Sequence, residues 1–293
     1  MSRLSPSQFG LLLLVFAAMV DSTSGLFTRL LSTTGFTTAS ARGFMAFGFL
    51  VILLLMRDGW RGPAAILRIG AWGLAFVGLN ALGMVLNILS LSNTSVANFF
   101  MIFATAPFVA AIAARFVLNE RLDVPTLLAA LAGFAGIAVM MASGAQSGGL
   151  LGDLLAMGCL FCYAALVLLV RRAPSLDMLP VIAVTVLMSG LLALPFADFG
   201  TISSADWVIL ALFGAIQLAG GNLLIFAAVR RIPAAQGGLL GILNAAFAPA
   251  WVFLALGEVP SQATLVGGAI ILSAAIAHLI WTLAASRRSE QAA

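Results

Sequence analysis

Asp21 lies inside an apolar run, "FGLLLLVFAAMVDSTSGLF", where a charged side chain is unusual. Ionisable residues inside membrane-spanning segments are rare, and they commonly mark proton relays or substrate paths. Three roles are therefore open for Asp21: proton coupling, an ion pair or local hydrogen bonds, and binding of a substrate amine. Arg42 is the candidate partner for the ion pair, because only a short polar segment separates the two apolar runs that contain these residues.

Other polar side chains recur near the middle of apolar runs. A side-chain amide that faces lipid is costly, so each should face a cavity or another helix. The alternative is a purely structural hydrogen bond between helices, which contributes about 0.6 kcal/mol. From depth and residue type we predict that the substrate-binding residues come from Asn80, Asn87, Asn98, Met101, Tyr163, Gln217, Asn222, Asn244 and Trp251.

Motifs typical of enzymes are missing from the sequence. It contains neither an H-E-x-x-H metal motif nor a phosphate-binding loop, and it has no lysine. Cys159 and Cys162 have C-x-x-C spacing, but they lie within the apolar run "GCLFCYAALVLL", where two small packing residues are the favoured interpretation. We therefore expect no catalytic residue, no metal and no cofactor. Nucleic acid is not an expected partner either, because the arginines are scattered between apolar runs.

The elements that position these residues are predicted to be membrane helices. Of the 293 residues, 62% are apolar and 8% are charged, whereas soluble domains carry about 25% charged residues. A span needs roughly 20 mostly apolar residues. The sequence has ten such runs and thus predicts an all-α, single transmembrane domain over 1–293, with spans near 9–31, 38–56, 69–90, 96–116, 125–143, 152–170, 179–196, 205–229, 234–256 and 260–284.

The arginines predict the orientation of these spans. With the N-terminus inside, only Arg29 and Arg42 fall on the outer side, and the other twelve arginines fall on the cytoplasmic side. This bias follows the positive-inside rule. We therefore expect a multi-pass protein of the cell inner membrane with both termini in the cytoplasm. The inner arginines are Arg3, Arg57, Arg61, Arg68, Arg115, Arg121, Arg171, Arg172, Arg230, Arg231, Arg287 and Arg288.

The second half of the chain repeats a pattern of the first. "ATAPFVAAIAARFVLNE" places Pro107 inside an apolar run that ends at Glu120, and "NAAFAPAWVFLALGE" does the same with Pro249 and Glu258. Each repeat, near 9–143 and 152–284, holds five spans, so the second enters the membrane from the opposite side. Inverted repeats are typical of secondary transporters that work by alternating access. The prolines either kink the cavity wall or are merely tolerated, and the glutamates suit gating or structural contacts.

Two segments, "TSVANFFMIFATAPFVAAIAARFVLNERL" and "IPAAQGGLLGILNAAFAPAWVFLALGEVPS", resemble the paired motifs of the drug/metabolite transporter superfamily, in its ten-helix EamA-type branch. "TASARGFMAFGFL" is similar to that branch's second helix, with Arg42 at the motif arginine. The resemblance implies a cavity between spans 1–4 and 6–9. It also implies proton-coupled or exchange transport, with the amino-acid exporters similar to YddG as the nearest group. In that setting Asp21, Arg42, Pro107, Glu120, Pro249 and Glu258 are the candidate coupling or gating residues.

The polar residues also limit the substrate. A carrier of sugar phosphates needs Arg or Lys to neutralise phosphate inside the membrane. This chain has no Lys, and its arginines lie near span ends, with Arg42 the deepest. We expect a monomeric carrier of neutral amino acids or similar zwitterions in the lipid bilayer. Export and coupling to protons are what the family resemblance implies. A channel, or a carrier of drugs or other metabolites with the same fold, is the alternative.

Overall fold

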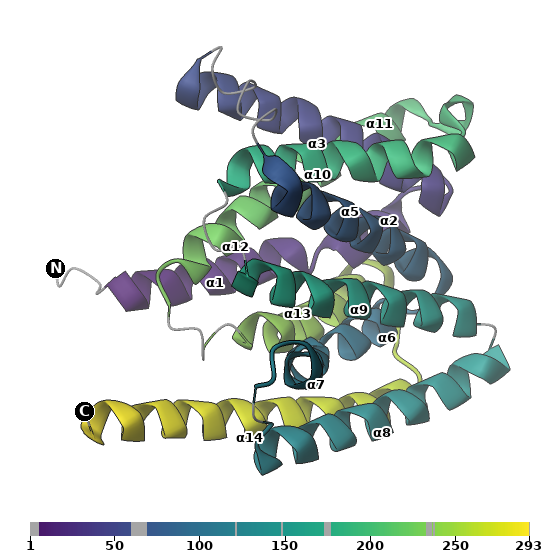
Figure 1. The fold of residues 1–293 in the computed structure, drawn as a ribbon. Helices are drawn as coiled ribbons and strands as arrows, with labels where there is room; N and C mark the ends of the chain where they lie inside the picture. The colour runs from purple at the N-terminus through teal and green to yellow at the C-terminus, as the bar shows by residue number, and fades with distance from the viewer. Residues whose placement is uncertain are drawn as a thin grey trace, which may run out of the picture.

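The part of the chain that the structure describes contains ten apolar helical stretches (Figure 1), and each is long enough to cross a membrane. The computed structural model describes residues 6–59, 69–120, 122–147, 149–172, 177–232, 236 and 238–292. Within these ranges all ten predicted spans are confirmed, with bounds that differ by a few residues. Arg3, Arg61, Arg68, Arg121 and the Gly144–Leu151 loop residue Gly148 lie outside the described residues.

The helices run back and forth between two faces. Because the number of crossings is even, α1 begins and α14 ends at the same face, which we call the termini face; the opposite one is the far face. The helices are α1 (Pro6–Asp21), α2 (Ser24–Leu30), α3 (Gly35–Asp58), α5 (Gly70–Asn93), α6 (Val96–Phe103), α7 (Ala106–Val117), α8 (Val124–Ser147), α9 (Leu150–Arg172), α10 (Met178–Ala193), α11 (Ser204–Leu212), a π-helical segment (Phe213–Gly220), α12 (Gly221–Val229), α13 (Leu239–Leu256) and α14 (Gln262–Ala292).

The helix contacts reproduce the repeat seen in the sequence. Three pairs join an element to its own counterpart in the other half: α3 with α10, α8 with α14, and α6 with α13. Other contacts are matched between the halves as well, because α1 packs on α12 as α9 packs on α5, and α1 packs on α13 as α9 packs on α7. Figure 1 shows α3 and α10 at one edge and α8 and α14 at the other. Two inverted five-helix halves account for this pattern.

Both edge pairs cross where glycines let the backbones meet. A Cβ on Gly136 of α8 would lie 2.6 Å from the carbonyl oxygen of Gly267 on α14. A Cβ on Gly43 of α3 would lie 2.7 Å from the carbonyl oxygen of Val186 on α10. Small residues permit such close packing of membrane helices. Ser40 adds a hydrogen bond of 2.9 Å from its hydroxyl to the carbonyl oxygen of Gly190 on α10.

Three spans are irregular near their middle. The first divides between α1 and α2, where the hydroxyls of Ser22 and Thr23 donate back to the carbonyl oxygens of Met19 and Val20. Such back-bonding competes with the helical ladder. The fourth span divides between α6 and α7, just before Pro107, and the eighth passes through the π-helical segment. Pro249 lies inside α13, which the structure describes as one helix.

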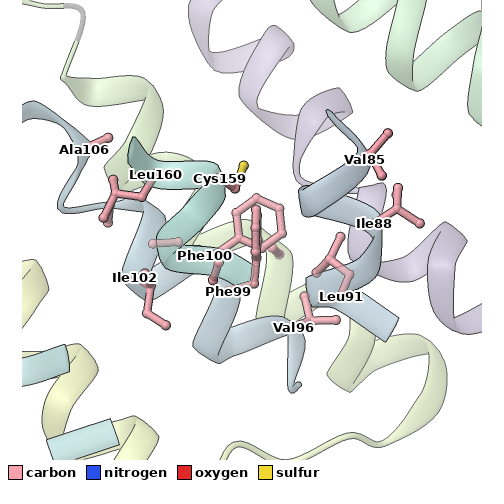
Figure 2. Close-up of a cluster of buried hydrophobic side chains, with 14 of the residues drawn as sticks. Val85, Ile88, Leu91, Val96, Phe99, Phe100, Ile102, Ala106, Cys159 and Leu160 are labelled. Carbon is pink, nitrogen blue, oxygen red and sulfur yellow. The ribbon is translucent and has the colours of Figure 1, made fainter. Parts of the chain in front are cut away.

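The largest apolar core joins α5, α6 and α9 (Figure 2). Leu91 of α5, Phe99 and Phe100 of α6, and Leu160 of α9 are all buried there. Cys159 belongs to the same cluster, and both cysteines are buried free thiols. Their surroundings agree with the packing interpretation of the C-x-x-C spacing.

Candidate functional site

Asp21 ends α1 at the break in the first span, and two amides from the second half of the chain reach it. Gln217 Nε2 donates to Asp21 Oδ1 at 3.2 Å, and Asn244 Nδ2 donates to Asp21 Oδ2 at 2.8 Å. Gln217 Nε2 also lies 3.2 Å from the main-chain carbonyl oxygen of Asp21. Both carboxylate oxygens are therefore engaged, by side chains from the π-helical segment and from α13. Local hydrogen bonds were one of the three roles that the sequence left open for Asp21.

Irregular helices place these groups. The main-chain carbonyl of Asp21 is free to accept from Gln217 because α1 ends there. Gln217 itself lies in the π-helical segment, and single-turn π-bulges often occur at functional sites. Broken helices at mid-membrane depth are also where secondary transporters form their binding sites.

Arg42 is buried close to this cluster, on α3. Only 2% of it is exposed, its Nη2 donates to the carbonyl oxygen of Met84 at 3.3 Å, and its guanidinium stacks 4.8 Å from the centre of the Phe213 ring. The charges of Asp21 and Arg42 attract each other, but no direct ion pair joins them in the described structure. The buried guanidinium therefore lacks a carboxylate of its own.

Three buried side-chain atoms of this cluster have no hydrogen-bond partner: Arg42 Nε, Gln217 Oε1 and Asn244 Oδ1. Most buried polar atoms in proteins are paired, so such atoms call for a ligand, an ion or water. The amide orientations follow from Asp21, because a carboxylate accepts only from the N–H side of each amide. The cluster thus presents one cationic donor and two carbonyl acceptors.

Other residues predicted from the sequence lie around it. Trp251 Nε1 donates to Ser22 Oγ at 3.0 Å, which ties α13 to the break after α1. Tyr163 of α9 stacks edge-on against Phe103, with ring centres 5.2 Å apart, and its hydroxyl experiences the charge of Asp21. The structure therefore brings these two residues to the cluster of Asp21, Arg42, Gln217 and Asn244, which we call the central cluster.

The remaining candidates lie elsewhere. Asn98 takes part in a hydrogen-bond network near the far face, Met101 packs against Gly268 of α14, and Asn222 donates to the carbonyl oxygen of Leu218 in its own span at 2.6 Å. Asn80 and Asn87 lie half-buried on α5. Depth alone did not separate these residues from the central ones.

The network around Asn98 contains an acidic residue that the sequence analysis did not select. Asp153, one turn into α9 in "LLGDLL", is fully buried and accepts hydrogen bonds from Thr94 Oγ1 at 2.6 Å and Asn98 Nδ2 at 3.1 Å. Thr264 of α14 donates to Asn98 Oδ1 at 2.6 Å. This network joins α5, α6, α9 and α14 near the far face. The sequence signal for this site was Asp153 itself, a single carboxylate at the start of an apolar run.

The far face is also tied by Glu258, one of the predicted gating residues. Arg29 Nε lies 2.9 Å from Glu258 Oε2, and Arg29 donates to the carbonyl oxygens of Leu91 at 3.0 Å and Thr94 at 2.8 Å. Val96 N donates to Glu258 Oε1 at 3.3 Å. These contacts, which we call the far-face latch, connect α2, α5, α6 and the end of α13. The sequence analysis had placed Arg29 at this face but gave it no role.

The termini face is hollowed. A cavity of about 620 Å³ opens between α3, α10 and α12, and a second of about 250 Å³ lies between α7, α8, α13 and α14. Pro107 and His278 line the second cavity, where His278 Nε2 lies 2.8 Å from Thr126 Oγ1. Glu120 follows α7 at this face. The first cavity is lined by Arg57, Asp177, Met178, Leu179, Ile182, Leu223, Phe226, Ala227, Arg230 and Arg231.

Comparison with protein families identifies the family to which this fold belongs. The model of the EamA-like transporter family matches residues 8–142 and again 150–280, one match for each half. The chain belongs to the EamA-like transporter family. The ten-helix architecture and the family resemblance drawn from the sequence are thereby confirmed, and the protein is a multi-pass membrane transporter.

Structural comparison agrees with this assignment. A solved crystal structure of another protein is similar to this EamA-like transporter over 94% of this chain and 98% of its own, with a TM-score of 0.66 and 18% identity. At that identity the likeness shows the shared fold alone. No curated protein sequence matches the chain significantly.

For an EamA-like transporter, the central cluster has the features of a substrate site. It lies at helix breaks, its polar groups come from both halves, and it combines a half-buried carboxylate with a buried guanidinium. Such a site can bind a small molecule that carries complementary charges.

Proposed function

We propose that this EamA-like transporter is a secondary-active carrier of small zwitterions, most simply neutral amino acids, which it exports by alternating access. The observation that carries the proposal is the central cluster. The half-buried Asp21 and the buried Arg42 lie near each other without a direct ion pair, and three neighbouring polar atoms are unpartnered. A zwitterion carries a positive and a negative group, and so offers an opposite charge to each of these two side chains.

The unpartnered atoms suggest how an amino acid is held. Gln217 Oε1 and Asn244 Oδ1 are acceptors for its ammonium group, and Arg42 Nε is a donor to its carboxylate. Trp251 and Phe213 supply apolar surface next to these groups. A side chain bound against such surface is selected loosely, because one methylene more or less in an apolar pocket changes binding by about 1–3 kcal/mol.

The same residues argue against phosphorylated substrates. Arg42 is the buried arginine of the described helices, and it stands opposite the carboxylate of Asp21. A phosphate carries more negative charge than one guanidinium neutralises beside a carboxylate. A carrier of drugs or other metabolites with the same fold is the second candidate, since apolar surface and one acidic group would also suit organic cations.

Alternating access is supported by the unequal faces. The far-face latch ties four helices together, whereas two cavities open at the termini face. If the arginine bias puts the termini face in the cytoplasm of a cell with the protein in its inner membrane, both cavities face the cytoplasm. Exchange of shape between the two inverted halves would then open the far face.

Asp21 is our candidate for the coupling site. Asp21→Asn should abolish proton-driven transport while sparing exchange of substrate for substrate, because the asparagine cannot carry a proton across the membrane. Proteoliposomes with and without an imposed pH gradient test this. An unchanged response to the gradient would exclude Asp21 from coupling.

Counterflow tests the transport proposal itself. Purified protein in liposomes loaded with unlabelled methionine, threonine or phenylalanine should accumulate the labelled amino acid with saturation, whereas a channel should show neither property. Gln217→Ala and Asn244→Ala should weaken uptake. Asn222→Ala is the matched control, because its amide bonds within its own span. Uptake of a sugar phosphate without competition by any amino acid would defeat the proposal.

A further inference from the structure

The two amides on Asp21 are anchored differently. Gln217 Nε2 is shared between two acceptors, the Asp21 main-chain carbonyl oxygen and Oδ1, each at 3.2 Å. Asn244 Nδ2 has one acceptor, Asp21 Oδ2, at 2.8 Å. Each amide holds its carbonyl oxygen buried and unpartnered on its other side.

This difference decides which side-chain amide can rotate by half a turn, so that its nitrogen and oxygen exchange places. If Gln217 turned, its Oε1 would face the main-chain carbonyl oxygen of Asp21, and two acceptors cannot bond each other. The carbonyl is part of the backbone and accepts at every pH, so Gln217 stays in place. If Asn244 turned, its Oδ1 would face only Asp21 Oδ2. That contact is unfavourable while the carboxylate is ionised, and favourable once Oδ2 carries a proton and becomes a donor.

We propose that Asn244 transmits the protonation state of Asp21 to the substrate site by turning its side-chain amide. With Asp21 ionised, Asn244 Nδ2 donates to Oδ2, and the site presents two carbonyl acceptors. When a proton binds Oδ2, the new O–H donates to Asn244 Oδ1, and Nδ2 moves to the position that Oδ1 held. The only covalent change is the O–H bond on Asp21, and the proton leaves by the reverse step.

The consequence for the proposed transport function, on which this step rests, is mutual exclusion. An ammonium group needs acceptors, so it fits the site in which Gln217 Oε1 and Asn244 Oδ1 both face it. After the amide turns, an N–H donor replaces one acceptor and opposes the ammonium group. Proton and substrate therefore bind in turn, which is the condition for exchanging one for the other across the membrane.

Other groups that face Asp21 leave this mechanism in place. Arg42 on α3 contributes its positive charge, and Cys159 and Tyr163 on α9 lie within reach of the charge of Asp21. The elements packed on α1 in the described structure are α12, α13 and the π-helical segment. The last two bring amides to the carboxylate, and none of the three brings a charged side chain to it. Asn244 is thus a positioning residue that acts through Asp21.

Infrared difference spectra of the lipid-reconstituted protein test the proposal without any substrate. Acidification of the wild type should produce a carboxylic acid C=O band, absent from Asp21→Asn, together with a change in a side-chain amide band. That amide change should be lost in Asn244→Leu, which has nearly the same shape, and kept in Gln217→Leu. A wild type without the Asp21 band, or an amide change that survives in Asn244→Leu, would overturn the proposal.

Binding of labelled amino acid between pH 8 and pH 5 separates this inference from the proposed function. Affinity of the wild type should fall at least tenfold with acidification. Asn244→Leu should bind more weakly at pH 8 and change less than threefold, while Gln217→Leu should be weakened but keep the wild-type ratio. A full tenfold ratio in Asn244→Leu would mean that Asp21 acts directly. No binding by the wild type at any pH, with the infrared result intact, would refute the substrate class and leave the turning amide standing.

Discussion

Asp177 and Arg57 form an exposed ion pair at the mouth of the larger cavity, with Nη2 and Oδ2 2.9 Å apart. The hydrogen bond from Arg57 holds the pKa of Asp177 below its ordinary value. A lowered pKa in the folded state adds stability above the unfolded pKa, near 4, and that stability is lost as the pH falls through the lowered value.

Asp177→Asn should therefore reduce stability at pH 7 and have little effect near pH 3. Because the two side chains are 43% and 53% exposed, the expected loss is small, about 0.2–1 kcal/mol. Thermal melts of the detergent-purified protein at the two pH values check this. An equal loss at both would show that the residue contributes by something other than its charge.

For Glu258, in the far-face latch, we predict an effect on how tightly the far face is closed. Glu258→Gln removes the charge that holds Arg29, and both side chains are about a quarter exposed, so the closed state should lose about 0.2–1 kcal/mol, or up to fivefold in population. Val96→Cys, placed at a buried position under the latch in a background free of Cys159 and Cys162, reports this as faster labelling.

Asp198→Asn is the control for this experiment, since Asp198 lies at the far face and its side chain caps its own turn at Gly200. Labelling that is equally fast in the control would indicate general loosening. Labelling that stays at the wild-type rate in Glu258→Gln would show that the latch does not hold the far face closed.

Individual site residues were only partly predictable. Asp21, Gln217 and Asn244 could be selected because a polar side chain deep in an apolar run must find a partner. Which of them meet depends on how each helix is rotated about its axis, and hydropathy carries little information on rotation. Asn98 was selected by the same rule, but its amide bonds Asp153 and Thr264 near the far face.

Among the elements, the crossing of α8 and α14 should be sensitive to a single added methyl group. Gly136→Ala would force the backbones apart, because its Cβ would lie 2.6 Å from the carbonyl oxygen of Gly267. Overpacking typically costs about 1–3 kcal/mol. The expected result is a lower melting temperature in detergent.

Gly78→Ala is the matched control, because a Cβ on Gly78 of α5 meets nothing within 4 Å. It should melt at or above the wild-type temperature, since alanine favours the helix over glycine by up to about 1 kcal/mol. Equal losses in the two variants would remove close packing as the explanation.

Helix breaks were harder to predict than helices. Pro107 marked the division of the fourth span, and it stands at the start of α7. The break after Asp21 has no proline to signal it, and it depends on two hydroxyls that bond back to carbonyl oxygens. Pro249 lies in α13 without dividing it into two helices, although it holds the same place in the repeat as Pro107. Proline thus occurs at a helix break in one half and inside a continuous helix in the other.

For the whole molecule, orientation in the membrane is the property that the sequence predicts and that fusions can test. A cytoplasmic reporter joined after Arg288 should be active, and the same reporter inserted in the Gly144–Leu151 loop should not, because one helix, α9, separates that loop from the termini face. A periplasmic reporter should give the reverse pattern. Reports from the same side would contradict the ten-span topology.

The architecture was predictable because it follows from patterns summed over many residues. Ten apolar runs and a five-span repeat could be read directly, and the family match covers both halves. The unequal closure of the two faces could not be read in this way. Under the proposed alternating access it is one of two shapes that the inverted halves exchange, and both shapes are encoded by the same residues.

The two glycine crossings, of α3 with α10 and of α8 with α14, join equivalent helices of the two halves, as a two-fold interface joins two copies of one protein. At the crossing of α8 and α14 the close approach is reciprocal, because a Cβ on Gly136 would meet the carbonyl oxygen of Gly267 and a Cβ on Gly267 would meet that of Gly136. Elsewhere, equivalent positions in the two halves contact equivalent helices, but the residues they meet differ in type. Gly10 and Gly152 sit at equivalent close contacts, against Arg231 and against Asn93, and eleven residues beyond them stand Asp21 and Tyr163. The close glycine contacts are thus present in both halves, whereas of these two positions only Asp21 carries a carboxylate.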